Sequence, residues 1–281
     1  MIISTDSCAN LPKNYYKDFN IKMIPMQIVL NENTYDDLSD ELPVQEYYQK
    51  MREGASPTTA QINEYNAREY FEKLLELGED ILHISFSSAL SGSFNNIKRV
   101  ADELSATAKN KIVVIDSLNA SIGEGLLVLK AKDLRDESKT IDEIEAEIRA
   151  LIPTTCSYFN VDQLKYLVRG GRVGKFSGIV GTLLNIKPVL RVDENGKLVS
   201  YKKVISRKKA LGVIADIVAD KIVDKQYVYI AHAVCEGEAQ ALANELKNRL
   251  SVEPVVTDLT QVIGCHTGPG LIAVFFFGKE K

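Results

Sequence analysis

The sequence lacks any apolar run long enough to cross a bilayer. Its longest runs, such as residues 271–277, fall far short of the ~20 apolar residues that a membrane helix needs. Residues 1–4 lead straight into a strand-like run, without the basic start and apolar stretch of a secretory signal. We therefore expect a soluble, cytoplasmic protein whose contact with membranes is at most transient.

Metal-binding and nucleic-acid-binding patterns are also missing. The four cysteines, Cys8, Cys156, Cys235 and Cys265, have no CxxC spacing, so the sequence indicates neither a zinc site nor a disulfide framework. The three histidines form no HExxH pair. The formal net charge of −4 argues against non-specific attraction to nucleic-acid phosphates. We expect reduced thiols, no metal and no nucleic-acid partner.

Nucleotide-binding and hydrolase motifs are absent as well. The chain contains no GxxxxGK[ST] loop, no dinucleotide-binding GxGxxG and no GxSxG nucleophile elbow. Ser91 precedes Gly92 but has no recognisable activating context. We interpret Ser91 as a hydrogen-bond donor and not as a nucleophile.

The first half of the chain has the pattern of a parallel α/β domain. A length of 281 residues with 45% apolar composition suits two domains, at ~100–200 residues per domain. Short β-branched runs at residues 2–3, 81–84 and 112–115 alternate with helical patterns, as in βαβ units. Thr140 and Glu143 predict a capping box for a helix that ends before Pro153. We predict an N-terminal parallel-sheet α/β domain over residues 1–154.

The pattern changes after Pro153. Apolar runs at residues 189–192 and 198–204 flank a turn at residues 193–196, which predicts an antiparallel hairpin. A helix from about Ser206 and later alternating helix and strand patterns follow. We predict a C-terminal mixed-sheet α/β domain over residues 155–281.

Small hydroxyl and carboxyl side chains follow three of the predicted N-terminal strands, at residues 4–7, 85–88 and 116–117. In open parallel sheets this carboxyl edge is where ligands usually bind. The longest such stretch, residues 87–93, precedes a helix and could cradle a small anion. Ordinary helix capping explains the same residues.

Two other segments carry candidate ligand residues. Thr58 and Thr59 could donate to a ligand, or they could simply form a turn and a helix cap. Residues 264–270 predict a glycine-rich loop in which backbone approaches a ligand, with His266 as its titratable member. A histidine in such a turn is also commonly structural.

Arg169, Arg172 and Arg207 come from two basic segments. Such charges usually form a solvated surface. If they rim the same pocket, they would favour an acidic partner or a phosphorylated product.

Together and in this order, these segments resemble the DegV family of bacterial fatty acid-binding proteins. The ordered set runs nearly from end to end and is far more specific than any single motif. Its members are Thr5-Asp6-Ser7, Pro57-Thr58-Thr59-Ala60-Gln61, Leu90-Ser91-Gly92-Ser93, Asp116-Ser117, Tyr166-Leu167-Val168-Arg169-Gly170-Gly171-Arg172-Val173, Ile186-Lys187-Pro188-Val189, Arg207-Lys208-Lys209-Ala210 and His266-Thr267-Gly268-Pro269-Gly270.

The resemblance implies two α/β domains that enclose an acyl chain. It implies a carrier, without catalytic activity of its own, that supplies a long-chain fatty acid such as palmitate to a separate fatty acid kinase. The kinase makes acyl phosphate for phospholipid synthesis, and no cofactor is implied.

The resemblance also implies roles for particular residues. Thr59 and Ser91 would hold the carboxylate, and His266 would support them. The remaining ligand-binding candidates are Thr58, Gly92 and Gly268, and the candidates for contact with the kinase are Arg169, Arg172 and Arg207.

Two other functions remain open on the residues alone. The first is a phosphoryl-transfer enzyme that acts on a small polar substrate through Asp6, Asp116 and the nearby hydroxyls; the missing nucleotide loop counts against it. The second is a small-ligand sensor that regulates another protein through the basic residues.

Overall fold

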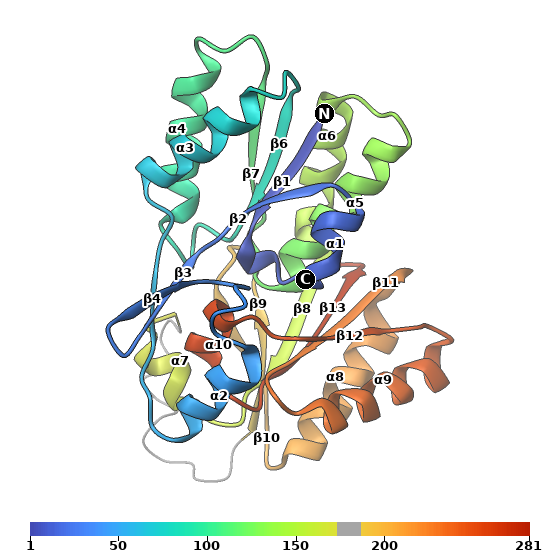
Figure 1. Ribbon diagram of the computed structural model, residues 1–281. Helices are drawn as coiled ribbons and strands as arrows, with labels where there is room; N and C mark the ends of the chain where they lie inside the picture. The colour runs from blue at the N-terminus through green and yellow to red at the C-terminus, as the bar shows by residue number, and fades with distance from the viewer. Residues whose placement is uncertain (173–186) are drawn as a thin grey trace.

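The computed structural model describes residues 1–172 and 187–281 (Figure 1). Within these ranges the strands form a four-stranded, a six-stranded and a three-stranded sheet. Val173 and Ile186, which belong to two of the motifs quoted above, lie outside the described residues. No helix in the described ranges is long and apolar enough to span a membrane.

The four-stranded sheet is parallel throughout and has the order β2-β1-β6-β7. Helices α3 and α4 lie on one side of it and α5 and α6 on the other (Figure 1). The strands predicted at residues 2–3, 81–84 and 112–115 are confirmed. The elements are β1 (Ile2–Asp6), α1 (Lys13–Asp18), β2 (Ile21–Ile24), α3 (Glu64–Leu75), β6 (Ile81–Ser85), α4 (Ser93–Ser105), β7 (Ile112–Asp116), α5 (Ile122–Asp136) and α6 (Ile141–Leu151).

The predicted capping box begins α6. The Glu143 carboxylate accepts the Thr140 backbone N–H at 2.8 Å, and the Thr140 hydroxyl accepts the Glu143 N–H at 3.4 Å. The helix ends at Leu151, before Pro153, as the sequence predicts.

The six-stranded sheet is mixed and has the order β10-β9-β8-β13-β11-β12. Strands β11 and β12 are parallel, whereas the other neighbours are antiparallel, including the predicted hairpin of β9 and β10. A parallel and a mixed sheet, each with helices, confirm the predicted fold class. The elements are β8 (Thr155–Asn160), α7 (Lys165–Arg169), β9 (Lys187–Val192), β10 (Leu198–Val204), α8 (Arg207–Lys221), β11 (Ile222–His232), α9 (Glu236–Leu250), β12 (Val255–Asp258) and β13 (Ile272–Gly278).

The two faces of the mixed sheet have different neighbours. Cys156 and Tyr158 on β8 belong to the core that includes α8 and α9. Ser157 and Phe159 alternate with them and therefore point to the opposite face, since successive side chains of a strand point to opposite sides. On β13, Val274 belongs to the same core and Phe275 lies on the opposite face. That second face is left for other segments to cover.

A three-stranded sheet and a helix, which the sequence pattern does not predict, pack against the C-terminal half on this side. They are β3 (Gln27–Leu30), β4 (Asn33–Asp36), α2 (Val44–Arg52) and β5 (Thr58–Ala60). Their contacts reach the C-terminal half: Tyr48 Oη donates to the Leu259 carbonyl at 3.1 Å, and Cys265 Sγ donates to the Pro57 carbonyl at 3.1 Å. The predicted boundary after residue 154 coincides with the start of β8. Because residues before it pack on the C-terminal half, the two-domain division stays a prediction.

The prediction of a glycine-rich loop over residues 264–270 is wrong for its first half. Gln261–Thr267 forms a helix, α10, which carries His266. Oδ1 of buried Asp37 accepts the N–H groups of Gln261 at 3.1 Å and Val262 at 3.3 Å, so this carboxyl group caps the helix. The left-handed backbone in this segment is confined to Gly268 and Gly270, after the helix.

Gly264 allows helices α10 and α2 to pack closely together, and it is not needed for a turn. A Cβ atom at this position would lie 2.0 Å from Tyr48 Oη, on α2. A side chain there would force α10 away from α2, which explains a glycine inside a short helix.

We predict that Gly264→Ala destabilises the protein by about 1–3 kcal/mol, the usual cost of overpacking. Urea denaturation measures this change. Gly212→Ala in α8 is the matched control, because no atom lies within 4 Å of its added Cβ. Replacing a glycine inside a helix by alanine should stabilise by roughly 0.5–1 kcal/mol. Equal effects of the two substitutions would contradict the packing argument.

Candidate functional site

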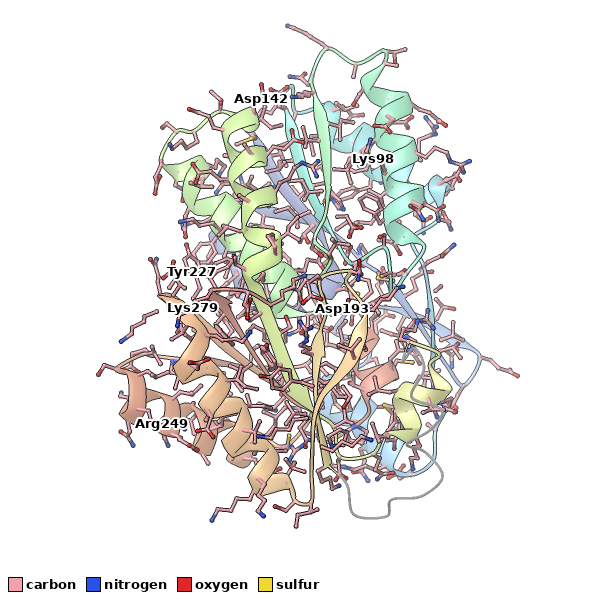
Figure 2. All side chains as sticks on the ribbon, turned by 180° about the vertical axis from the view of Figure 1, so that it is seen from behind. Lys98, Asp142, Asp193, Tyr227, Arg249 and Lys279 are labelled. Carbon is pink, nitrogen blue, oxygen red and sulfur yellow. The ribbon has the colours of Figure 1, made fainter. Side chains whose placement is uncertain are left out.

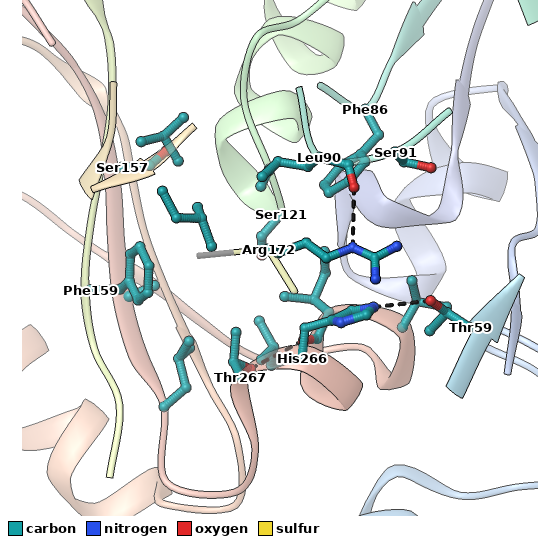
Figure 3. A pocket seen from close by; sticks show the side chains of 18 of the residues that line it. Thr59, Phe86, Leu90, Ser91, Ser121, Ser157, Phe159, Arg172, His266 and Thr267 are labelled. Atoms are coloured by element: carbon teal, nitrogen blue, oxygen red, sulfur yellow. Dashed lines mark hydrogen bonds between the residues drawn. The ribbon is translucent and has the colours of Figure 1, made fainter. Parts of the chain in front are cut away.

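A pocket lies between the second face of the mixed sheet, α10 and the loops at the carboxyl edge of β6 and β7 (Figure 3). The empty space within it and at its mouth is about 760 Å³. The walls are mostly apolar and include Phe86, Leu90, Phe159, Leu198, Val262 and Phe275.

Thr59 and His266 form the first part of a polar end. Thr59 lies on β5 and His266 on α10, and Thr59 Oγ1 is 2.9 Å from His266 Nε2 (Figure 3). Both side chains line the pocket. Local sequence cannot bring them together, because they meet only where the three-stranded sheet packs on α10.

The His266 ring is held neutral. Burial, followed by the positive charges of Arg172 and Arg169, lowers the pKa of His266 to about 4. Within the described residues its buried Nδ1 has no hydrogen-bond partner, and it lies so close to Gly170 that a Cβ there would be 2.3 Å away. An N–H at Nδ1 would be stranded, so we infer that the proton is on Nε2. Nε2 then donates to Thr59 Oγ1, and the Thr59 hydroxyl hydrogen remains available.

The Ser91 hydroxyl group is also positioned by hydrogen bonds from neighbouring groups. The Ile62 backbone N–H donates to Ser93 Oγ at 3.0 Å. Ser93 Oγ lies 2.9 Å from Ser91 Oγ, and the Ser93 N–H donates to Ser91 Oγ at 3.2 Å. With the Ser93 hydroxyl as donor, both acceptor positions of Ser91 are filled. The Ser91 hydrogen is then available to a ligand.

Arg172 contributes a positive charge to the same end of the pocket. Figure 3 shows its guanidinium between Ser91 on one side and Thr59 and His266 on the other. Nε donates to the Leu90 carbonyl at 3.3 Å, which fixes the side chain against the β6–α4 loop. Two free hydroxyl hydrogens and a guanidinium suit a ligand group that only accepts hydrogen bonds and is negatively charged. A carboxylate has both properties.

A second depression adjoins this polar end. It shares Thr59, Arg172 and His266 with the pocket and adds Thr58 and Arg169. Arg169 is hydrogen-bonded to Ser56 Oγ at its edge. The polar end of the pocket therefore faces a basic depression on the surface.

The structure brings together three of the predicted ligand residues, Thr59, Ser91 and His266, and places Thr58 in the outer depression. Gly92 and Gly268 lie in close packing contacts, and their predicted role in ligand binding stays a prediction. A Cβ on Gly92 would lie 2.2 Å from Oε1 of Gln61, which lines the pocket. A Cβ on Gly268 would lie 2.1 Å from the Tyr166 ring.

The three arginines are not equivalent. Arg169 lies in the depression, and Arg172 lines both the depression and the pocket. Arg207 lies elsewhere, where it donates to Asn160 Oδ1 at 2.8 Å and pairs with Glu238 at 3.2 Å. A partner-facing role for all three stays a prediction.

Asp6 and Asp116 bind backbone and are not among the lining residues of the pocket. Asp6 Oδ2 accepts the Phe86 N–H at 2.9 Å, and Asp116 Oδ1 accepts the Ser88 N–H at 3.1 Å. Burial raises the pKa of Asp6 to about 6. Both carboxyl groups thus shape the β6–α4 loop, an arrangement that does not favour the phosphoryl-transfer hypothesis.

Sequence reasoning missed several pocket residues, among them Gln61, Ser121, Ser157 and the inward position of Arg172. For Ser157, the alternation along residues 155–160 was an available signal, since it places Ser157 and Phe159 on one face. We find no such signal for Ser121, which lies in an irregular loop.

The fold and the pocket fit an α/β protein that encloses an amphipathic ligand with one anionic end. The chain belongs to the DegV family: the family model described as "Uncharacterised protein, DegV family" matches residues 1–279. A DegV domain-containing protein of Clostridium perfringens is 37% identical over 285 residues, covering 100% of this chain and 98% of that protein.

Solved structures of the family are similar over the whole chain. A DegV family protein from Thermus thermophilus, described by its fatty acid binding, has a TM-score of 0.89 and 31% identity, with 99% of both chains covered. DegV from Bacillus subtilis, described as a fatty acid binding protein, has a TM-score of 0.84 and 30% identity, again with 99% of both chains covered.

We predict that His266 stays neutral down to about pH 5 and titrates near pH 4. Its folded-state pKa lies below the ordinary value of 6.5, so its contribution to stability is fully present above pH 6.5 and is lost as the pH falls towards 4. Imidazole ¹⁵N shifts measured by NMR against pH test this, with His266→Gln to assign the signal. A midpoint above pH 6 would contradict the buried, neutral ring.

Proposed function

We propose that the protein binds a long-chain fatty acid in the pocket and presents its carboxylate to a partner fatty acid kinase, which forms the acyl phosphate. One observation carries the proposal: the hydroxyl groups of Thr59 and Ser91, each hydrogen-bonded to a neighbouring group that can act as the donor, lie at one end of an otherwise largely apolar pocket. The Arg172 guanidinium between them balances the charge of the acid. The chain acts as a carrier and performs no chemistry itself.

The free energies of binding expected for the apolar tail and for the carboxylate are consistent with this proposal. Burying ~15 methylenes at ~0.8 kcal/mol each gives on the order of 12 kcal/mol of gross transfer free energy. Each hydrogen bond to the charged carboxylate adds roughly 1.5–3 kcal/mol. The tail therefore supplies most of the affinity, and the polar end fixes which end of the acid faces outwards.

The relatives support the ligand class. The Thermus thermophilus and Bacillus subtilis proteins, described by fatty acid binding, match this chain over 99% of its length. Their shared fold and family make a fatty acid the natural occupant of a pocket with these walls.

The basic depression supports the role of a kinase partner. The carboxylate would lie at Thr59 and His266, which line both the pocket and the depression. A phosphoryl group delivered from outside would meet Arg169 and Arg172 there, and guanidinium groups suit phosphate recognition. Arg207 would contribute a more distant contact with the kinase.

We predict that the purified protein carries a stoichiometric long-chain fatty acid, seen by native mass spectrometry. Thr59→Val keeps the shape of the side chain but removes its hydroxyl, and should weaken binding of the acid by roughly 10- to 100-fold, the value of one hydrogen bond to a charge. Thr59→Ser keeps the hydroxyl and is the matched control. A protein that contains no lipid and takes up no added acid would refute the proposed function.

We predict that Arg169→Glu leaves fatty acid binding intact but abolishes most phosphorylation of the bound acid by the kinase, because a negative charge would repel phosphate and an acidic partner. Binding is measured by fluorescence displacement, and turnover by acyl phosphate formation. Lys109→Glu, an exposed position in the loop between α4 and β7, is the control. Unchanged turnover with Arg169→Glu would remove the depression from the kinase interface.

A further inference from the structure

Ser121 introduces a polar group into the lining of the pocket away from its carboxylate end. It is the N-cap residue of α5 and is only 4% exposed. In the view of Figure 3 it lies between Ser91 on one side and Ser157 and Phe159 on the other.

The Ser121 hydroxyl has no hydrogen-bond partner among the residues that the structure describes. It does not cap α5, although serine is a favoured capping residue. A buried hydroxyl without a partner is unfavourable, and most buried polar atoms are satisfied. Because Ser121 lines the pocket, a polar group on a bound ligand could supply the missing partner after a small local adjustment.

The backbone at Ser121 is strained as well. Its φ of +55° and ψ of −143° lie in a region that residues with a Cβ rarely adopt. Such outliers cluster at functional sites, where the surrounding structure holds them in place. Ser121, with this backbone conformation, is one of the residues that line the pocket.

Ser157 supplies a complementary acceptor to the same pocket. Its hydroxyl hydrogen is donated to Asn119 Oδ1 at 2.6 Å, which leaves its oxygen able only to accept from a ligand. Ser121 can both donate and accept. A ligand hydroxyl can also donate and accept, whereas a methylene can do neither and a carbonyl cannot donate.

We infer that Ser121 forms a second polar subsite in the pocket, which binds a hydroxyl group on the acyl chain, so that the ligands include hydroxylated long-chain fatty acids. This inference rests on the proposed function, since it assumes that an acyl chain occupies the pocket. It adds a substrate class and a specificity-determining residue. The carboxylate end, at Thr59 and Ser91, is common to both kinds of acid.

The test compares stearic acid with hydroxystearic acids whose hydroxyl lies near the carboxylate, at mid-chain or near the methyl end. Delipidated protein is titrated with each acid by displacement of a fluorescent fatty acid. For one isomer, the affinity ratio of hydroxylated to unsubstituted acid should be about tenfold higher in the wild type than in Ser121→Ala. Alanine, like serine, has a Cβ atom, so the substitution removes the hydroxyl without relieving the unfavourable backbone conformation at this position.

Two further readouts make the assignment specific. Ser121→Ala should bind stearic acid at least as tightly as the wild type, because it removes a polar atom that faces methylenes. Ser91→Ala is the control at the carboxylate end and should weaken both acids by the same factor, leaving their ratio unchanged. Ser121→Ala should therefore change the affinity ratio of the two acids, whereas Ser91→Ala should change both affinities but not their ratio.

Several outcomes would overturn the inference. If wild-type protein binds stearic acid but every hydroxylated isomer binds more weakly, the subsite does not exist, while the proposed function stands. A preference for one isomer that persists in Ser121→Ala would remove Ser121 from the subsite. If neither kind of acid binds, the proposed function fails and this inference fails with it.

Discussion

The hydrogen bond between Thr59 and His266 joins two segments that lie 207 residues apart in the sequence. Each partner is held by its own surroundings: Thr59 by the pairing of β5 with β3, and His266 by α10, whose start is capped by Asp37. Burial keeps the imidazole neutral, and because its buried Nδ1 has no partner among the described residues, we place the remaining proton on Nε2, which donates to Thr59. The direction of the Thr59 hydroxyl, and with it the polarity of the pocket, depends on this contact.

The pocket lies on the face of the mixed sheet that is not packed against the sheet's own helices. Helices α8 and α9 cover one face of the mixed sheet, and the other face looks towards the carboxyl edge of the parallel sheet and α10 (Figure 2 gives the view from behind). Apolar side chains left on that inner face would be unfavourable in water. In the proposed function an acyl chain would cover them, and the ligand would complete a core that the protein leaves open.

Sequence patterns succeeded where local physics dominates. β-branched runs gave β1, β6 and β7, and the Thr140 capping box gave the start of α6. They failed at α10, because Gly264 is required by the close approach of Tyr48 and not by a turn. The three-stranded sheet was missed because β3, β4 and β5 are short, and β5 pairs with β3 only after α2 has intervened.

By itself, the sequence determined the α/β class, the parallel and mixed sheets, and Thr59, Ser91 and His266 as candidate ligand residues. The tertiary structure alone decided which aliphatic side chains face the pocket, that Arg172 points into it, and that Arg207 is held elsewhere by Asn160. The reason is physical. Periodicity reports that a side chain is buried, but a core position and a pocket position have the same period, and only the packing of distant segments distinguishes them.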